Sequence, residues 1–308
     1  MILCCGEALV DMLPRKSEAG EPAYAPYAGG ASFNTAIALG RLGVPTGFLS
    51  GISFDLFGQL LARTLADSNV AIDYTARSER PTTLAFVDLV DGQANYTFYG
   101  ENAADRMLGE SDLPEIDDAV TALQFGAISL AQEPCGTTYE ALMRRESGKR
   151  VILLDPNIRP NFIADRDSHL ARMRRMIALA DIIKISDEDM RWFGEEGDTD
   201  AIAGRWLDAG PRLVVITAGA AGITAYFRGG KVHADVRRID VVDTVGAGDT
   251  FSAGLMASLW RDGLMSTQTF AGFDKEAIAR ALDLGTRAAA VTVSRAGANP
   301  PWADEIGF

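Results

Sequence analysis

Residues 243–251, Asp-Thr-Val-Gly-Ala-Gly-Asp-Thr-Phe, hold the most informative pattern in the chain. Small residues lead straight into a helix that is expected to start near Gly248 and to continue over Thr250–Arg261. They allow the backbone N–H groups of Ala247, Gly248 and Asp249 to converge on one point, next to the positive end of the helix dipole. The stretch therefore predicts an anion hole suited to a phosphoryl group. It is neither a P-loop, because no Gly-Lys-Ser/Thr follows, nor a G-x-G-x-x-G fingerprint.

Asp249 stands at the end of this glycine-rich stretch, where its charge would repel a bound anion. Its carboxylate can instead accept the proton of an attacking hydroxyl group, as the catalytic Asp of kinases does. The alternative is that Asp249 is only a helix N-terminal acid that offsets the dipole. These nine residues alone leave both interpretations open. At a helix start, we expect the pKa of Asp249 to be low. The position of its carboxylate relative to the attacking hydroxyl would then matter more for catalysis than its basicity.

Outward from this stretch, apolar strand patterns alternate with amphipathic helix patterns along most of the chain. Continuous apolar strands between such helices are typical of a parallel sheet covered on both faces. The sequence therefore predicts a doubly wound, mostly parallel α/β fold. Strands are expected at 2–8, 122–130, 151–154, 181–185 and 213–217, and helices at 34–42, 54–67, 169–180, 250–261 and 275–291.

Two segments interrupt this alternation. Met12–Tyr27 is rich in Pro, Gly and charge, and Thr83–Tyr99 contains two β-type runs joined by Asp91-Gly92, a type I′ hairpin signal. A hairpin is antiparallel and cannot be a further βαβ unit. We expect a small β-sheet flap that projects from the main domain, with an edge hairpin of the main sheet as the alternative.

A pair of glycines opens the predicted helix at 34–42. Gly29 and Gly30 precede Asn34, whose amide offers a donor and an acceptor that suit adjacent sugar hydroxyls. Most Gly-Gly helix entries are only turns, so this motif is weak by itself.

Two further motifs follow predicted strands. Asp155-Pro156-Asn157-Ile158-Arg159 comes directly after 151–154, and ligands of parallel α/β sheets gather outside the carboxyl ends of strands. Arg159 is a permanent cation that can meet a phosphate. The turn Thr217–Gly222 follows 213–217 and is a place where a nucleotide could approach the backbone, although a plain β-turn is the alternative.

Composition excludes several classes of function. With 29 Lys and Arg against 42 Asp and Glu, the net charge is −13, so a nucleic acid or an anionic membrane surface is not an expected partner. No apolar run is long enough to span a bilayer, and the first residues do not resemble a secretory signal. Cys4, Cys5 and Cys135 are expected to be reduced core residues, which indicates a cytoplasmic protein.

With these motifs in this order, the sequence resembles the ribokinase-like (PfkB) carbohydrate kinases over essentially the whole chain. The resemblance rests on Gly29-Gly30 with Asn34, on Thr217-x-Gly219-x-x-Gly222, and on residues 243–249. Within the family, the stretches 6–12, 184–189 and 294–301 look most like those of bacterial fructokinases. The resemblance implies one kinase domain over 1–308 with a sugar-covering lid formed by 12–27 and 83–99.

The resemblance assigns expected roles to individual residues. Asp249 is the catalytic base, and Gly246, Ala247 and Gly248 form the anion hole. The sugar site is Asp11, Gly29, Gly30, Asn34, Phe98, Asn157, Arg159 and Asp249. The nucleotide site is Lys184, Ser186, Thr217, Gly219, Gly222, Gly246 and Gly248. A monovalent cation is expected at the Asp243 carboxylate and at backbone carbonyls near Val245, Arg295 and Gly297.

The sequence departs from the family pattern at three points. Where the family often has Asn-x-x-Glu, this chain has Ser186 and Asp189, so Asp189 is expected to support Mg²⁺ through water, with Glu188 as its rival. Related sugar-acid kinases carry an arginine soon after the Phe-Tyr pair of the lid. Gly100 follows Phe98-Tyr99 here, which favours a neutral sugar. Pro301 stands near the position of a family hydroxyl ligand for the monovalent cation.

The implied activity is transfer of the γ-phosphate of ATP to a primary hydroxyl of a free sugar, D-fructose giving fructose 6-phosphate. Mg²⁺ is the implied cofactor and K⁺ a further one. A kinase of the same family that acts on 2-keto-3-deoxygluconate, ribose or a nucleoside is the first alternative. A non-catalytic sugar or nucleotide sensor is the second, and loss of Asp249 would be its mark. Apolar residues of both parities in 83–90 predict a homodimer that forms through the lid.

Overall fold

The main sheet has nine strands, and the computed structural model describes residues 1–90, 93–237 and 239–308. Seven strands pair in parallel; at one edge β14 pairs antiparallel with β13 and β15 pairs antiparallel with β14, so that only β14 runs opposite to the other strands of this sheet. Along the sheet the order is β15 (Gly230–Ala234), β14 (Ile223–Phe227), β13 (Leu213–Thr217), β12 (Ile182–Ser186), β11 (Val151–Asp155), β10 (Ala122–Gly126), β1 (Ile2–Cys5), β4 (Thr46–Leu49) and β6 (Val70–Ala71). The predicted doubly wound, mostly parallel fold is confirmed.

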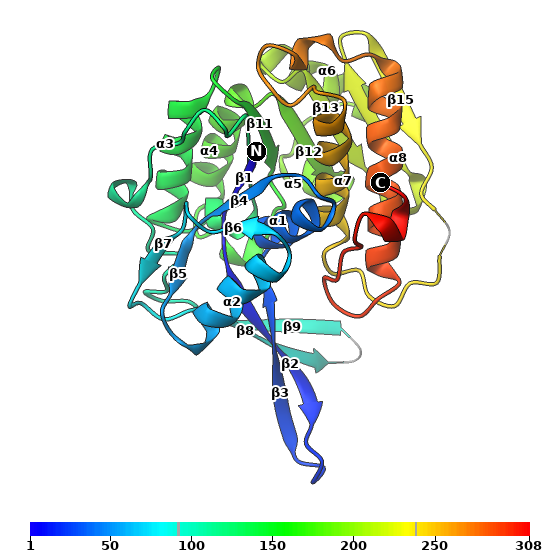
Figure 1. Ribbon diagram of the computed structural model, residues 1–308. Helices are drawn as coiled ribbons and strands as arrows, with labels where there is room; N and C mark the ends of the chain where they lie inside the picture. Colours follow the sequence, from blue (N-terminus) through cyan, green and yellow to red (C-terminus); the bar gives the residue numbers. More distant parts are fainter. Residues whose placement is uncertain (91–92, 238) are drawn as a thin grey trace.

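Helices cover both faces of this sheet (Figure 1). One face carries α1 (Ala31–Arg41), α2 (Leu56–Asp67), α7 (Ala247–Arg261) and α8 (Lys275–Val293), and the other carries α3 (Cys135–Glu146), α4 (Arg166–Leu179), α5 (Asp187–Trp192) and α6 (Thr199–Ala209). Successive side chains of a strand point to opposite faces, so Cys4 belongs to one core and Cys5 to the other. Both are buried and free, as is Cys135.

A separate four-stranded sheet projects from one end of the main body (Figure 1). Its order is β3 (Pro22–Gly29), β2 (Leu9–Lys16), β8 (Thr83–Val90) and β9 (Gln93–Tyr99), and we call it the small sheet. The expected antiparallel hairpin of β8 and β9 is present, and it does not belong to the edge of the main sheet. The predicted Asp91-Gly92 turn lies outside the described residues. A two-stranded sheet of β5 (Gly51–Ser53) and β7 (Ala76–Ser78) completes the β structure of the described chain.

The strand predicted at 122–130 is shorter than expected. β10 ends at Gly126, and 127–130 form a 3-10 turn that begins at Ala127 with a positive φ of 62°. Gly126 packs so tightly on the next strand that a Cβ there would lie 2.2 Å from the carbonyl oxygen of Asp155. The backbone leaves the sheet at the next residue, because the left-handed conformation of Ala127 cannot continue a strand. The apolar residues that suggested more strand, Ile128 and Leu130, are buried in the turn instead.

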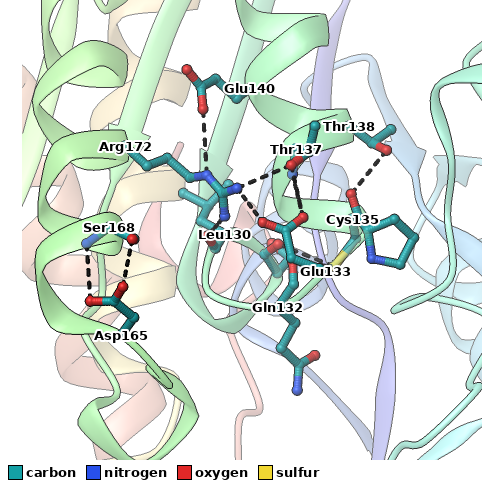
Figure 2. Close-up of polar contacts among 12 residues, drawn as sticks. Leu130, Gln132, Glu133, Cys135, Thr137, Thr138, Glu140, Asp165, Ser168 and Arg172 are labelled. Carbon is teal, nitrogen blue, oxygen red and sulfur yellow. Dashed lines mark hydrogen bonds and ion pairs between the residues drawn. The ribbon is translucent and has the colours of Figure 1, made fainter.

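A polar cluster between α3 and α4 fixes this turn (Figure 2). Arg172 of α4 donates to the carbonyl oxygen of Leu130 at 2.9 Å and to the Thr137 hydroxyl at 3.1 Å, and it pairs with Glu133 and Glu140. An arginine offers five donors in a rigid plane, so one side chain can hold several segments together. The carboxyl end of β10 is thereby tied to both helices. No helix of the described chain is long and apolar enough to cross a bilayer.

Candidate active site

Two of the predicted site residues, Asn34 and Asp249, meet where α1 and α7 begin, outside the carboxyl ends of the parallel strands. Asn34 Nδ2 donates a hydrogen bond of 2.9 Å to Asp249 Oδ2 across 215 positions of sequence. Thr35 Oγ1 donates to the backbone carbonyl of Asp249 at 3.4 Å. Ligands of doubly wound sheets bind at this edge, close to the point where the strand order reverses beside β1. The two glycine motifs of the sequence thus form one site.

Asp249 lies in the first turn of α7 and is only 8% exposed. Burial raises the pKa of its carboxyl to about 7, and the charge of Asp155 adds to this effect. The Asn34 hydrogen bond and the charge of Lys184 act in the opposite direction. The expectation of a low pKa was wrong, because loss of water around the carboxylate outweighs the helix terminus. A carboxyl with such a pKa is suited to accept a proton near neutrality.

The residues of the predicted anion hole lie at the start of α7, where the N–H of Ala247 donates to the carbonyl oxygen of Thr244 at 3.3 Å. Gly246 precedes α7 with φ of +77°, and a Cβ there would lie 2.7 Å from Cβ of Ala298. Ala247 then begins the helix, and Gly246, at the N-cap, has no side chain that could accept hydrogen bonds from the first N–H groups of α7. A Cβ at Gly248 would approach Lys184 Nζ to 3.0 Å, so the ammonium group lies directly against this turn. The helix start therefore combines N–H donors with a positive charge, as a phosphoryl site requires.

Lys184, in the middle of β12, forms an ion pair with Asp155, the last residue of the neighbouring strand β11. Nζ lies 2.8 Å from Asp155 Oδ2, and both side chains are 6% exposed. Burial acts to lower the pKa of Lys184, but the charge and hydrogen bond of Asp155, together with the charges of Asp249 and Asp189, outweigh it and the pKa is raised. Ser252 of α7 also donates to Asp155 at 3.5 Å. Sequence reasoning placed Asp155 in a motif but gave it no role in the site, although it is the first polar residue after a buried strand.

Asp11 lies on β2, in the small sheet, and faces the start of α1. A Cβ at Gly29 would lie 2.4 Å from Asp11 Oδ2, so only glycine leaves room for this carboxylate. Burial raises the pKa of Asp11 to about 6. Asp11 pairs with Ala85 and Ala85 with Phe98 in the strand register, which places all three on one face of the small sheet. The predicted sugar residues on this sheet therefore share its inner face.

Asp189 and its rival Glu188 point in different directions. Asp189 is buried and accepts a hydrogen bond of 3.1 Å from the backbone N–H of Ile158, in the loop after β11, whereas Glu188 is exposed. Asp189 thus faces the loop that holds the predicted residues Asn157 and Arg159. Burial raises the pKa of Asp189, while a hydrogen bond with Ser186 and the charge of Arg159 lower it. The geometry favours Asp189 as the acid that could support a metal.

The predicted nucleotide turn joins β13 to β14. Thr217 pairs with Ser186 in the register of β12 and β13, so these two predicted residues lie side by side. Gly219 and Gly222 have φ of +49° and +93°, and a Cβ at Gly222 would lie 2.7 Å from the carbonyl oxygen of Ala234. Both glycines are therefore required by the backbone.

The predicted monovalent-cation residues also come together. The Asp243 carboxylate accepts hydrogen bonds from the backbone N–H of Val245 at 3.0 Å and of Gly297 at 2.9 Å, which joins the loop before α7 to the loop after α8. The Arg295 side chain pairs with Glu305, so only its backbone carbonyl can serve the site. The described residues contain no cluster of three or more His, Cys, Asp or Glu side chains that could hold a metal.

Two buried carboxylates near the site were missed. Glu7, directly after β1, is 3% exposed, and Asp105 is 4% exposed and accepts a hydrogen bond of 2.6 Å from Thr83 Oγ1. Burial raises the pKa of both, to about 6 for Asp105. Glu7 could have been found as the first charged residue after an apolar strand. Asp105 lies in an irregular segment that carries no such signal.

The site combines a base near neutrality, an amide-lined helix start and a buried ammonium group, which suits phosphoryl transfer to a hydroxyl. The model of the pfkB family carbohydrate kinases matches residues 1–305. The chain belongs to this family. Among curated proteins, the family member fructokinase of Rhizobium leguminosarum bv. trifolii is 57% identical over 278 residues, which is 90% of this chain and 85% of the relative.

Solved structures of pfkB-type kinases share the fold. Fructokinase of Xylella fastidiosa with bound ATP superimposes with a TM-score of 0.87 at 27% identity, over 96% of this chain and 93% of that one. Aminoimidazole riboside kinase of Salmonella enterica, in complex with its riboside and an ATP analogue, gives a TM-score of 0.84 at 26% identity, over 99% and 98% of the two chains. The family prediction made from the motifs is confirmed.

Proposed function

We propose that this protein is an ATP-dependent fructokinase that converts D-fructose to fructose 6-phosphate. The observation that carries the proposal is the hydrogen bond between Asn34 and Asp249, because it joins the predicted sugar-binding amide to the predicted base. The relative at 57% identity, named as a fructokinase, supports the choice of sugar. Gly100 supports a neutral sugar, since a Cβ there would come within 3.2 Å of the Thr83 side chain and leaves little room for an acid-binding arginine.

In the proposed mechanism, Asp11, Gly29, Gly30 and Asn34 hold the sugar so that its primary hydroxyl faces Asp249. The hydroxyl oxygen forms a bond to the γ-phosphorus of ATP while its proton passes to Asp249. The bond between the γ-phosphorus and the bridging oxygen breaks, and ADP leaves. The N–H groups of 246–248 and the ammonium of Lys184 stabilise the charge that develops on the phosphoryl oxygens.

The remaining predicted residues surround the nucleotide and its ions. Thr217, Gly219 and Gly222 would lie against the nucleotide, with Ser186 beside them. The Asp189 carboxylate would hold a hard cation such as Mg²⁺ through water, and the bound ion would neutralise charge on the phosphates of ATP. The loops joined by Asp243 offer oxygen ligands to K⁺. Asn157 and Arg159 lie after β11, where they could meet the sugar or its phosphate.

We further propose that the small sheet is the lid of the site and that two copies pair through it. Its inner face carries Asp11 and Phe98. On the outer face, Phe86 makes edge-to-face contacts with Tyr24 and Tyr99, which are 48% and 63% exposed. An exposed aromatic row of this kind is typical of an interface. A cytoplasmic location is proposed from the reduced cysteines.

A panel of acceptors tests the activity. ADP release from Mg-ATP would be measured with D-fructose, D-glucose, D-ribose, 2-keto-3-deoxygluconate, a nucleoside and aminoimidazole riboside. The highest kcat/KM is expected with D-fructose. A higher value with another acceptor would reassign the substrate within the family. Nucleotide and sugar binding without turnover on any acceptor would indicate a sensor.

A further inference from the structure

Helix α1 begins without a cap from its own sequence. Its N-cap residue is Gly30, which has φ of +114° and no side chain, and the first turn of α1 contains no acidic residue. The first N–H groups of a helix need acceptors, which Ser, Thr, Asp or Asn at the N-cap usually supply. Here the backbone N–H of Ala31 donates instead to Glu7 Oε1, at 2.7 Å. The cap comes from a residue 24 positions earlier in the chain.

Glu7 joins three segments of the chain. It follows β1, its Oε1 caps α1, and its Oε2 accepts a weaker hydrogen bond of 3.4 Å from the backbone N–H of Ser129, in the turn after β10. The contacts of Arg172 with Leu130 hold that same turn in place (Figure 2). One oxygen of the Glu7 carboxylate therefore contacts the turn that Arg172 holds in place, and the other contacts the start of α1.

The fit between Glu7 and Gly30 is close. A Cβ at Gly30 would lie 2.7 Å from the carbonyl oxygen of Glu7 and 3.2 Å from its Cγ. Glu7 is 3% exposed, and no salt bridge of the described residues includes it. Burying a carboxylate is costly unless N–H donors satisfy it, so these hydrogen bonds are needed to keep the charge at this position.

We infer that Glu7 is a positioning residue of the sugar site, which sets the first turn of α1 and through it the Asn34 amide that meets Asp249. The first helical hydrogen bond runs from the Asn34 N–H to the Gly30 carbonyl at 2.8 Å, so a shift at the cap is passed directly to Asn34. Asn34 and Thr35 of the same turn then contact Asp249. This inference rests on the proposed function, because it uses the sugar-binding role of Gly30 and Asn34.

The alternative is that Glu7 only stabilises the fold. The two roles predict different effects of a Glu7 substitution on the KM values for the sugar and for ATP. The predicted nucleotide residues lie on β12, on α7 and on the turn between β13 and β14, and none of them contacts Glu7 in the described hydrogen bonds. A positioning residue should therefore affect the sugar and leave the nucleotide unchanged, whereas a general loss of stability would affect both.

The test compares Glu7→Gln with the wild-type protein. Glutamine keeps the shape but presents an amide N–H₂ to one of the two backbone donors and removes the charge from the helix terminus. We expect the fructose KM to rise about tenfold, in line with the loss of a charge-assisted hydrogen bond, with the ATP KM unchanged. Hydrogen exchange in a peptide that covers residues 30–36 should become faster. This measurement reports on the cap of α1 and does not depend on enzymatic activity.

Asp165→Asn is the matched control. Asp165 caps α4 by accepting from the N–H groups of Asp167 and Ser168, and it takes no part in the proposed site; Figure 2 shows its contact with Ser168. This variant should leave both KM values unchanged. If Glu7→Gln does not fold, Glu7→Asp keeps the charge on a shorter arm, and a selective rise in the sugar KM is again expected.

Three results would overturn the inference, and the first two are unchanged exchange in 30–36, or faster exchange with an unchanged sugar KM. Equal rises in the KM for sugar and for ATP would assign Glu7 to the fold alone. If the wild-type protein does not phosphorylate fructose, the proposed function fails by itself. The same comparison then uses the best acceptor of the panel, so the role of Glu7 is still decided.

Discussion

At the scale of single residues, Asp249 carries the clearest prediction. Its pKa of about 7 means that the carboxyl is protonated below neutrality and can accept a proton only above it. At subsaturating ATP, kcat/KM should therefore fall about tenfold per pH unit below the pKa and stay level above it. Asp249→Asn should still bind ATP and sugar, lose kcat by roughly 10²–10⁴-fold and lose this acidic limb. A loss of less than about fivefold would reduce Asp249 to a helix-terminal acid.

At the scale of elements, we expect the rigidity of the proposed anion hole to depend on the loop before α7. Asp243 joins this loop to the one after α8 across 54 positions, and K⁺ bound to the carbonyls near Val245, Arg295 and Gly297 would stiffen both. We expect higher kcat in potassium chloride than in choline chloride. The Gly297 carbonyl already accepts from the Asn299 N–H, and Pro301 offers no hydroxyl, so the site should be weak. Equal rates in sodium-only, potassium-only and choline buffers would reject the monovalent-cation site.

At the scale of the whole molecule, the small sheet predicts a dimer. Part of its inner face packs on the chain itself, where Ala85, Leu9 and Ile128 form a small core, and we expect the partner at the outer aromatic row of Tyr24, Phe86 and Tyr99. Light scattering at micromolar concentration should give the mass of two chains. Tyr24→Lys, on the outer face, should yield monomers, whereas Tyr27→Lys, equally exposed on the opposite face of the same strand, should not. A wild-type monomer with full activity would leave the sheet as a lid only.

The sequence by itself determined the features that depend on neighbouring residues. Alternating apolar strands and amphipathic helices predicted the doubly wound sheet. The glycines at 246 and 222 marked backbone turns that need a positive φ, and the start of α7 at Ala247 follows from that local geometry. Such features could be predicted because propensity, periodicity and turn chemistry act over a few positions.

Only the tertiary structure decided how these motifs act together. The Asn34–Asp249 hydrogen bond, the Lys184–Asp155 pair and the cap that Glu7 gives to α1 each join residues that are distant in the chain. No local pattern encodes such contacts, because they depend on how strands and helices pack. The raised pKa of Asp249 was mispredicted for the same reason: it follows from burial, and burial exists only once the whole fold has excluded water from the carboxylate.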